Sequence, residues 1–377
     1  MPFPYLSSSG VDMKKQQPLH DTLQHPGRRS ALKTAAAGAA ALAFPAVWTS
    51  ARAASKRIVV RDDGGVYAKA YTEILYRPFT EKTGIQVVNV QANAEPTAQI
   101  KSMVETGSYT WDMAKISQPA ILLLTSGKEY LEKHALEADP VIAKIPKQYM
   151  SPYGVGTNVY TTVLAYRTDA FKGRKAPSSW SDMWNLKDFP GRRALRKYPF
   201  DTIEEALMAD GVPTGQVYPC DLDRAFKSLD KLAKHVDVWW STGAQVEQML
   251  GSGEVDMVAT WASRAQSAQA NGAPVGIVWN QNIWGCDNWS ILKGTPNADA
   301  CREFIKFASD AKRQAELVKF FPAGVTQPDA FRFIKPEVAR NCPTFPDNMK
   351  SGLHIDAKYW QAKQSVALER FNRWVLS

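Results

Sequence analysis

The sequence predicts an α/β protein with two lobes, each a mixed sheet flanked by helices, and with short hinge strands joining them. Strand patterns alternate with helix patterns along the chain, which is typical of parallel strands with crossover helices. The 324 residues that follow residue 53 are enough for two cores, and no glycine/serine tether separates them. We therefore expect residues 54–160 with 287–327 to form lobe 1, and residues 161–286 with 328–377 to form lobe 2.

The N-terminus has the pattern of an export signal. Arg28 and Arg29 form a twin-arginine pair, an apolar run extends from Ala35 to Val47, and Ala51-Arg52-Ala53 has the small residues of a cleavage site. The 13 residues of the apolar run are too few to cross a bilayer, because a spanning helix needs about 20. We expect residues 1–53 to be removed and the mature protein to lie in the periplasm.

Much of the chain's basic charge lies in this leader. The net charge is +9 for the whole chain, but only 40 basic and 35 acidic residues follow residue 53, which gives +5. The longest remaining basic cluster is Arg192, Arg193, Arg196 and Lys197, and it has neither interleaved aromatic residues nor glycine-rich arms. Such a cluster beside a strand is typical of a solvated edge, so we expect no nucleic-acid partner.

Two loops in the first lobe attract attention because each follows a predicted strand. The expected elements are a strand at 55–60, a helix ending at Gly84, a strand at 85–90, a helix at 96–105 and a strand at 111–116. The first strand leads into the turn from Asp62 to Tyr67, and the third leads into Ser117 and Gln118. Binding residues in parallel sheets gather at the carboxyl ends of strands, so both loops are candidate binding loops.

The second lobe is predicted from the same kind of pattern. The expected elements are a crossing strand at 160–166, a short helix within 177–191, a strand at 194–198, helices at 203–210 and 221–234, and a helix that stops at Gly251. A buried strand at 255–260 then leads into Trp261. Strands at 277–279 and 287–292 carry the chain back, before a helix at 298–317.

Catalytic, metal and cofactor motifs are missing from the sequence that follows the leader. Its histidines, His134, His235 and His354, lie far apart, and no nucleophile elbow or complete dinucleotide loop occurs. An oxidising compartment would permit disulfides among Cys220, Cys286, Cys301 and Cys342, with three possible pairings, and a free buried thiol is the alternative for each. None has the Cys-x-x-Cys spacing of a redox or zinc site. We expect no metal, no cofactor and no enzyme activity.

Aromatic residues are concentrated in the second half. Six tryptophans occur between Trp239 and Trp289, and two of them, Trp240 and Trp261, stand at predicted strand ends. An indole face attracts a cation, and a carboxylate beside it adds a charge-assisted hydrogen bond. Asp201 and Asp287 are the acids placed for this role, although each could instead cap a helix or stabilise a turn.

Four segments and one single residue, in this order, resemble one protein family. They are Phe79–Ile85, the run PSSWSDMWNLKDFPG at Pro177–Gly191, Gly253–Met257, Trp261, and Lys293–Asn297. The chain is similar to periplasmic solute-binding proteins of ABC importers, of the spermidine/putrescine-binding type. The resemblance implies the periplasmic-binding-protein fold, a monomer, and delivery of a small solute to an inner-membrane ABC permease.

The resemblance also implies a ligand clamped between aromatic walls, with acids that bind its amines. Carried over by position, Tyr67 and Trp261 are wall aromatics, Ser117 is a polar contact, and Asp287 and Asp201 are the acids. Gln118, Trp240 and Trp284 complete the predicted ligand-binding set.

The sequence departs from the family pattern at two wall positions, where Gly285 and Ala323 replace expected aromatic residues. We predict putrescine, spermidine or a related amine as the ligand. Arg196 and Lys197 keep a zwitterionic or anionic solute open as an alternative, and a periplasmic enzyme is the less favoured one.

Overall fold

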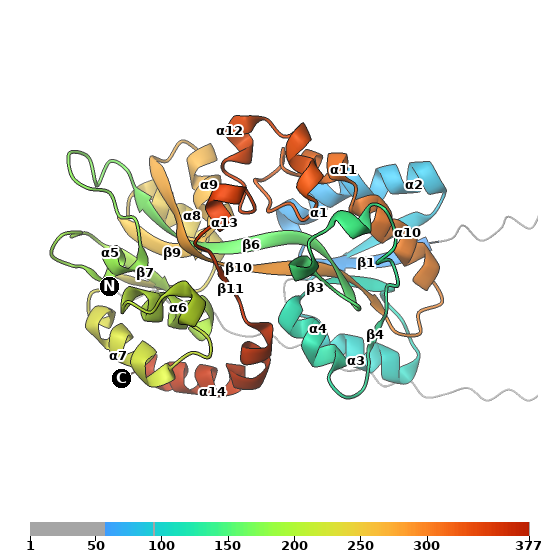
Figure 1. Cartoon of the computed structure of the whole chain (residues 1–377), viewed down its shortest axis with the longest axis horizontal. Helices are drawn as coiled ribbons and strands as arrows, with labels where there is room; N and C mark the ends of the chain where they lie inside the picture. Colours follow the sequence, from blue (N-terminus) through green and yellow to red (C-terminus); the bar gives the residue numbers. More distant parts are fainter. Residues whose placement is uncertain (1–56, 93–94, 377) are drawn as a thin grey trace, which may run out of the picture. The chain divides into compact units, whose positions relative to one another are not determined.

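A mixed sheet forms the centre of the fold in the computed structural model, which describes residues 57–92 and 95–376 (Figure 1). Its main path is β2-β1-β3-β10-β6-β9-β7-β8, and β4, β5 and β11 pair at its sides. The predicted export signal at residues 1–53 lies outside the described residues. The predicted α/β architecture of two lobes is confirmed for the residues that the structure describes.

The strands are β1 (Arg57–Asp62), β2 (Gln86–Gln91), β3 (Met113–Ser117), β4 (Leu131–Glu132), β5 (Met150–Ser151), β6 (Gly154–Arg167), β7 (Arg193–Arg196), β8 (Val238–Trp240), β9 (Met257–Trp261), β10 (Val275–Leu292) and β11 (Leu353–His354). The helices are α1 (Gly65–Tyr71), the π-helical turn η1 (Thr72–Tyr76), α2 (Arg77–Thr83), α3 (Thr97–Thr106), α4 (Gln118–Thr125), α5 (Trp180–Trp184), α6 (Pro199–Ala209), α7 (Leu222–Ala233), α8 (Gly243–Ser252), α9 (Ala262–Ala270), α10 (Ala298–Ala308), α11 (Ala311–Leu317), α12 (Pro336–Ala339), α13 (Pro346–Met349) and α14 (Ala357–Val375). Four short 3₁₀ turns are η2 (Ile142–Lys144), η3 (Lys147–Tyr149), η4 (Thr214–Gln216) and η5 (Pro328–Phe333).

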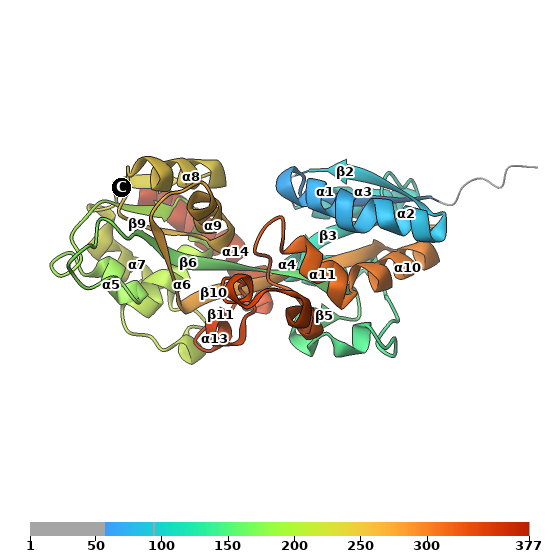
Figure 2. The same ribbon diagram turned by 90° about the horizontal axis from the view of Figure 1, so that it is seen from above.

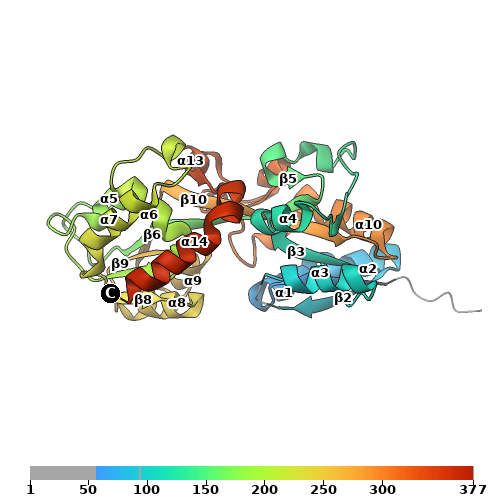
Figure 3. The ribbon, with the colours of Figure 1, turned by 90° about the horizontal axis from the view of Figure 1, so that it is seen from below.

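We call β1–β5 with α1–α4, α10 and α11 the first lobe. Its strands β1, β2 and β3 are parallel, and successive residues of β1 face opposite sides of the sheet. Ile58 and Val60 pack with α1 and α2, whereas Val59 packs in the core that contains α3. Figure 2 shows α1 and α2 on one side of the first-lobe strands and Figure 3 shows α3 on the other, so helices cover both faces of these strands.

We call α5–α9 with β7–β9 and α14 the second lobe. Strands β7, β8 and β9 are parallel. Helices α6, α7 and α14 enclose one core and α8 and α9 another, and Figure 3 shows α14 reaching toward α4 of the first lobe. Trp180 of α5 is buried, and its indole nitrogen donates to the Gln281 carbonyl at 2.8 Å, so it braces this lobe at a distance from any binding loop.

Two long antiparallel strands, β6 and β10, run from one lobe to the other (Figure 1). The sequence predicted short hinge strands and two separate segments at 277–279 and 287–292. The structure instead has one 18-residue strand, β10, paired with the 14-residue β6. The pairing shifts between Val278 and Ile283, and Gln281 in this interval has a positive φ of 59°. A bulge of this kind lets one strand continue through a break in its pattern.

The four cysteines are buried and free, so none of the three possible disulfide pairings forms in the structure. Within residues 57–92 and 95–376, no group of three or more His, Cys, Asp or Glu side chains could hold a metal ion. None of the described helices combines the length and apolar character that crossing a membrane requires.

Candidate functional site

A cavity of about 1130 Å³ lies between the two lobes. It is lined by the loops that follow β1 and β3, by the middle of β6 and β10, and by the first turns of α6 and α9. The structure brings five of the eight predicted binding residues together around it: Tyr67, Ser117, Asp201, Trp261 and Asp287. These residues are far apart in the sequence and meet because the strands of the two lobes direct their carboxyl ends toward the cavity, while the crossing strand β10 supplies Asp287 and the first turn of α6 supplies Asp201.

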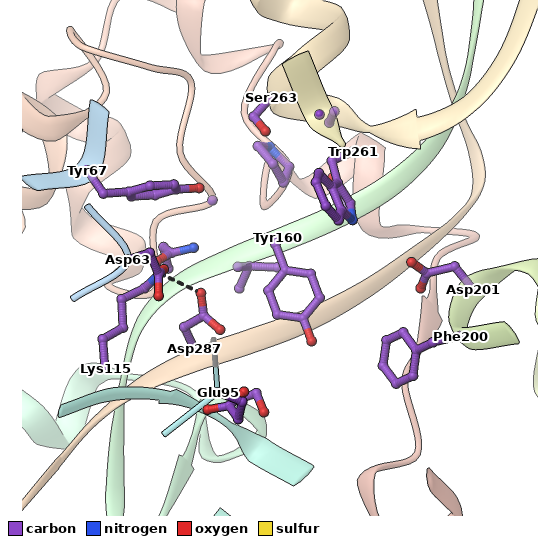
Figure 4. Close-up of a pocket in the computed structure, with 18 of the residues that line it drawn as sticks. Asp63, Tyr67, Glu95, Lys115, Tyr160, Phe200, Asp201, Trp261, Ser263 and Asp287 are labelled. Carbon is purple, nitrogen blue, oxygen red and sulfur yellow. Dashed lines mark hydrogen bonds and ion pairs between the residues drawn. The ribbon is translucent and has the colours of Figure 1, made fainter. Parts of the chain in front are cut away.

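The first-lobe wall is built around a buried lysine that the sequence analysis did not select (Figure 4). The Lys115 ammonium lies 4.5 Å from the centre of the Tyr67 ring. It is 2.8 Å from Oδ2 of Asp287 and also pairs with Asp63. Burial by itself lowers the pKa of Lys115, but Asp287, Tyr71 and Asp63 together raise it well above its usual value. Lys115 is therefore a cation.

Two more groups complete this wall. The ring of Phe321 packs edge-on against Tyr67, with the ring centres 4.7 Å apart. Glu95 also lines the cavity, and burial, with a contribution from Asp287, raises the pKa of its carboxyl group. The first-lobe wall thus presents three acids, Asp63, Glu95 and Asp287, and one cation, Lys115, to the cavity.

The second-lobe wall centres on Trp261, the last residue of β9. The Arg196 guanidinium lies 4.9 Å from the Trp261 ring centre and pairs with Oδ2 of Asp201 at 3.4 Å. The Thr162 hydroxyl donates to the same oxygen at 2.9 Å. Oδ1 of Asp201 is buried without a hydrogen-bond partner, and burial raises the pKa of this carboxyl group. Asp201 itself has a positive φ of 71°, a backbone conformation that costs energy and is often found at functional sites.

Helix α9 begins directly after Trp261 and points its first turn into the cavity. Ala262, Ser263 and Arg264 all line the cavity, and no side chain caps the helix. Arg264 bonds to Glu247 through Nη1 at 2.6 Å, but its Nε is buried without a partner. The guanidinium lies against Gly243, where a Cβ would be only 2.4 Å from Nε. Free amides at a helix start and a guanidinium favour an anion.

The structure explains the two departures from the family pattern. Gly285 is paired directly with Tyr160 across the β6–β10 ladder, and a Cβ at 285 would lie 2.4 Å from the Tyr160 hydroxyl. Tyr160 therefore covers the glycine and contributes the ring that position 285 lacks (Figure 4). Phe321 similarly stands two residues before Ala323, and both line the cavity. The sequence alone could not identify Tyr160 as the substitute for an aromatic residue at position 285, because the direct pairing of these two residues across the strands is visible only in the structure.

The other three predicted residues do not line the cavity. Gln118 is turned away, and its Nε2 donates to the Gln148 carbonyl at 2.9 Å. Trp240 is 1% exposed and lies beneath Trp261, with its indole nitrogen bonded to the Ala259 carbonyl. Trp284 stacks on His354 with the ring centres 3.9 Å apart. Since side chains alternate along a strand, Trp284 points to the side of β10 opposite to Asp287, which lines the cavity.

Residues 75–340 match the family model of bacterial extracellular solute-binding proteins. The chain belongs to this family. A gamma-aminobutyric acid (GABA)-binding protein of Pseudomonas aeruginosa is 35% identical over 342 residues, which cover 88% of this chain and 94% of that protein.

Solved structures agree with this assignment. An ABC transporter substrate-binding protein from Bradyrhizobium japonicum has a TM-score of 0.79 at 36% identity, over 85% of this chain and 99% of that one. A solved GABA receptor has a TM-score of 0.76 at 30% identity, over 85% and 98% of the two chains. The protein is a substrate-binding component of an ABC transporter and not an enzyme, and membership of an extracellular family agrees with the predicted periplasmic location.

Proposed function

We propose that this solute-binding protein binds a small zwitterion of the GABA class, in which an amino group and a carboxylate are separated by a short chain. The supporting observation is the unequal distribution of charge across the cavity. The first-lobe wall carries three acids, Asp63, Glu95 and Asp287, and one cation, Lys115. The second-lobe wall carries two guanidinium groups, Arg196 and Arg264, and one acid, Asp201. A ligand with opposite charges at its two ends complements this arrangement.

The ligand's ammonium group would lie against the first-lobe wall. Asp287 and Asp63 share Lys115, and Asp63 also pairs with Arg61, so the three acids of this wall and these two cations leave one negative charge to be neutralised. The Tyr160 ring stands next to Asp287 and faces the cavity (Figure 4). An ammonium over an aromatic face gains about 0.5–2 kcal/mol, depending on how completely it is desolvated.

The carboxylate would lie against the second-lobe wall. Nε of Arg264 has no hydrogen-bond partner, and the uncapped start of α9 presents backbone amides beside it. Hydrogen bonds from a guanidinium to a carboxylate are about twice as strong as neutral ones. The GABA-binding relative and the GABA receptor support a ligand of this kind for the present chain.

A polyamine, the ligand class that the sequence predicted, fits the second-lobe wall less well. Its second ammonium would lie near Arg196 and Arg264, and Asp201 already has Arg196 as a partner at 3.4 Å. A desolvated charge without a partner costs several kcal/mol. A polyamine is therefore the alternative ligand, and a binding experiment must distinguish it from a zwitterion.

Isothermal titration with ligands of equal chain length tests the proposal. GABA has both charged groups, butylamine has only the ammonium, butyrate has only the carboxylate, and putrescine has two ammonium groups. We expect GABA to bind most tightly, and we expect the loss of either charged end to weaken binding by about 100-fold, because a buried partner is left unpaired. Tighter binding of putrescine than of GABA would contradict the proposal.

We also infer that residues 1–53 direct export of the protein by the twin-arginine route. The exported protein would then deliver its solute to an inner-membrane permease. The paired arginines at 28 and 29, the short apolar run and the small residues before position 54 support this route. Replacement of both arginines by lysine should leave the precursor in the cytoplasm, as fractionation and immunoblotting would detect. Normal periplasmic accumulation of this variant would argue for another export route.

A further inference from the structure

Lys115 occupies the kind of environment that an amine ligand needs. Its ammonium lies over the Tyr67 ring at 4.5 Å, is 2.8 Å from Asp287, and also pairs with Asp63. Its side chain is only 2% exposed, yet it lines the cavity. An aromatic face with carboxylates at its edge is the arrangement by which proteins recognise ammonium groups. In this protein, the face of Tyr67 and the carboxylates beside it are already occupied by the side chain of Lys115.

We infer that Lys115 is a specificity-determining residue: it acts as an internal ammonium that limits the cleft to ligands with one amino group. The inference rests on the proposed function in so far as it names the feature that favours a zwitterion over a diamine. Without Lys115, the carboxylate of Asp287 would be open to a ligand ammonium beside the uncovered ring of Tyr67. With Lys115, one negative charge is neutralised and the face of Tyr67 is covered.

The position of Lys115 in the sheet explains why it stays there. It lies on β3, opposite Trp289 of β10 in the antiparallel ladder, between the buried residues Ala114 and Ile116. A rigid central strand gives the side chain little freedom to leave the cavity. The lysine is consequently a fixed part of the wall and not a surface residue that a ligand could displace at low cost.

Asp63 does not depend on Lys115 alone for a partner. Nη1 of Arg61 lies 3.4 Å from Oδ1 of Asp63 and also donates to the Lys115 carbonyl at 2.8 Å. The carboxylate of Asp63 is 35% exposed, so water can also solvate it. A neutral residue at position 115 would thus leave Asp63 with a cation and with solvent, while Asp287 would become available to a ligand ammonium.

The experiment compares the affinities of Lys115→Met and of the natural protein for putrescine and GABA by isothermal titration. Lys82→Met is the matched control, because Lys82 also lies over an aromatic ring, Phe307, at 5.7 Å, but does not line the cavity. Lys115→Met should raise the ratio of putrescine to GABA affinity by about tenfold or more, since a desolvated cation–ring and cation–carboxylate site becomes free. Lys82→Met should leave the ratio unchanged.

Stability must be measured alongside binding, by thermal unfolding followed with circular dichroism. If Lys115→Met is too unstable to titrate, Lys115→Gln provides a neutral side chain that can still donate to Asp287. A folded neutral variant with an unchanged affinity ratio would show that Lys115 is only a structural clamp, and would overturn the inference.

The outcomes also separate this inference from the proposed ligand class. If the natural protein fails to bind GABA but a neutral variant gains putrescine binding, the role of Lys115 stands and the zwitterion proposal falls. If the natural protein binds GABA and the variant gains nothing, only the role of Lys115 falls.

Discussion

The buried carboxyl group of Glu204 should make stability fall as the pH rises toward neutrality. Glu204 lies in α6, is 0% exposed, and accepts hydrogen bonds from the Tyr218 hydroxyl at 2.5 Å and the Trp360 indole at 2.6 Å. Burial is the main cause that raises the pKa of Glu204 from 4.5 to about 7, and the negative charge of Asp201 is the second cause. The same burial raises the pKa values of Asp201 and Glu205, which lie on the same helix.

The size and sign of the effect follow from this shift. Between pH 4.5 and about 7 the folded protein keeps a proton on Glu204 that the unfolded chain has lost. Stability therefore decreases as the pH rises through this interval. Each pH unit corresponds to about 1.4 kcal/mol, so the contribution that is fully present below pH 4.5 and lost above pH 7 is about 3 kcal/mol.

Urea denaturation at pH 5 and pH 8, followed by tryptophan fluorescence, would measure the effect. Glu204→Gln keeps an oxygen that can accept from Trp360 but cannot ionise. The natural protein should therefore lose about 2.5 kcal/mol more than this variant between pH 5 and pH 8, since part of the full effect falls below pH 5. Glu303→Gln, at an exposed position of α10, is the control and should behave like the natural protein. Equal pH dependence in all three proteins would refute the reasoning.

Three further predictions concern the cavity. Arg264→Gln should weaken GABA binding by about 2 kcal/mol and leave butylamine binding nearly unchanged, because only the carboxylate loses a charged donor; titration of both ligands would check this, and equal losses would contradict it. Trp261→Ala should reduce affinity by about 1–2 kcal/mol through lost ring contact and should remove most of the fluorescence response to ligand; an intact response would assign it to another indole. Gly285→Ala should lower both the unfolding temperature and the affinity, because a Cβ there would lie 2.4 Å from the Tyr160 hydroxyl; normal values of both would show that Tyr160 moves freely.

Much of the cleft could be predicted because strand ends are visible in a sequence. The glycine turn after β1, the polar residues after β3 and the tryptophan at the end of β9 each follow a recognisable strand. Parallel pairing brings Tyr67 and Ser117 to the same edge of the first lobe. Because β9 runs opposite to β1 and β3, its carboxyl end places Trp261 across the cavity from them. The prediction of these residues needs only the local strand pattern and the rule that binding residues gather at the carboxyl ends of strands. It does not need the exact register of the sheet.

Prediction of the remaining cavity residues requires the register of the strand pairs and the face of the sheet to which each side chain points. Tyr160 reaches the cavity because it stands opposite Gly285, and Trp284 misses it because it is one residue away on the same strand. Lys115 did carry a signal, since a charged residue within the apolar strand segment WDMAKI needs a partner when buried. Its partner Asp287 is 172 positions later in the chain, a distance across which sequence patterns give no pairing.

The place of β10 in the sheet has a consequence for how the chain folds. This strand lies between β3 and β6, but its residues, Val275–Leu292, come late in a chain of 377 residues. Until they have been synthesised, β3 and β6 each present an open edge of unpaired backbone groups, which invites association with other chains. Folding of this protein must therefore be completed late, and a truncation before residue 275 should aggregate and not yield a separate first lobe.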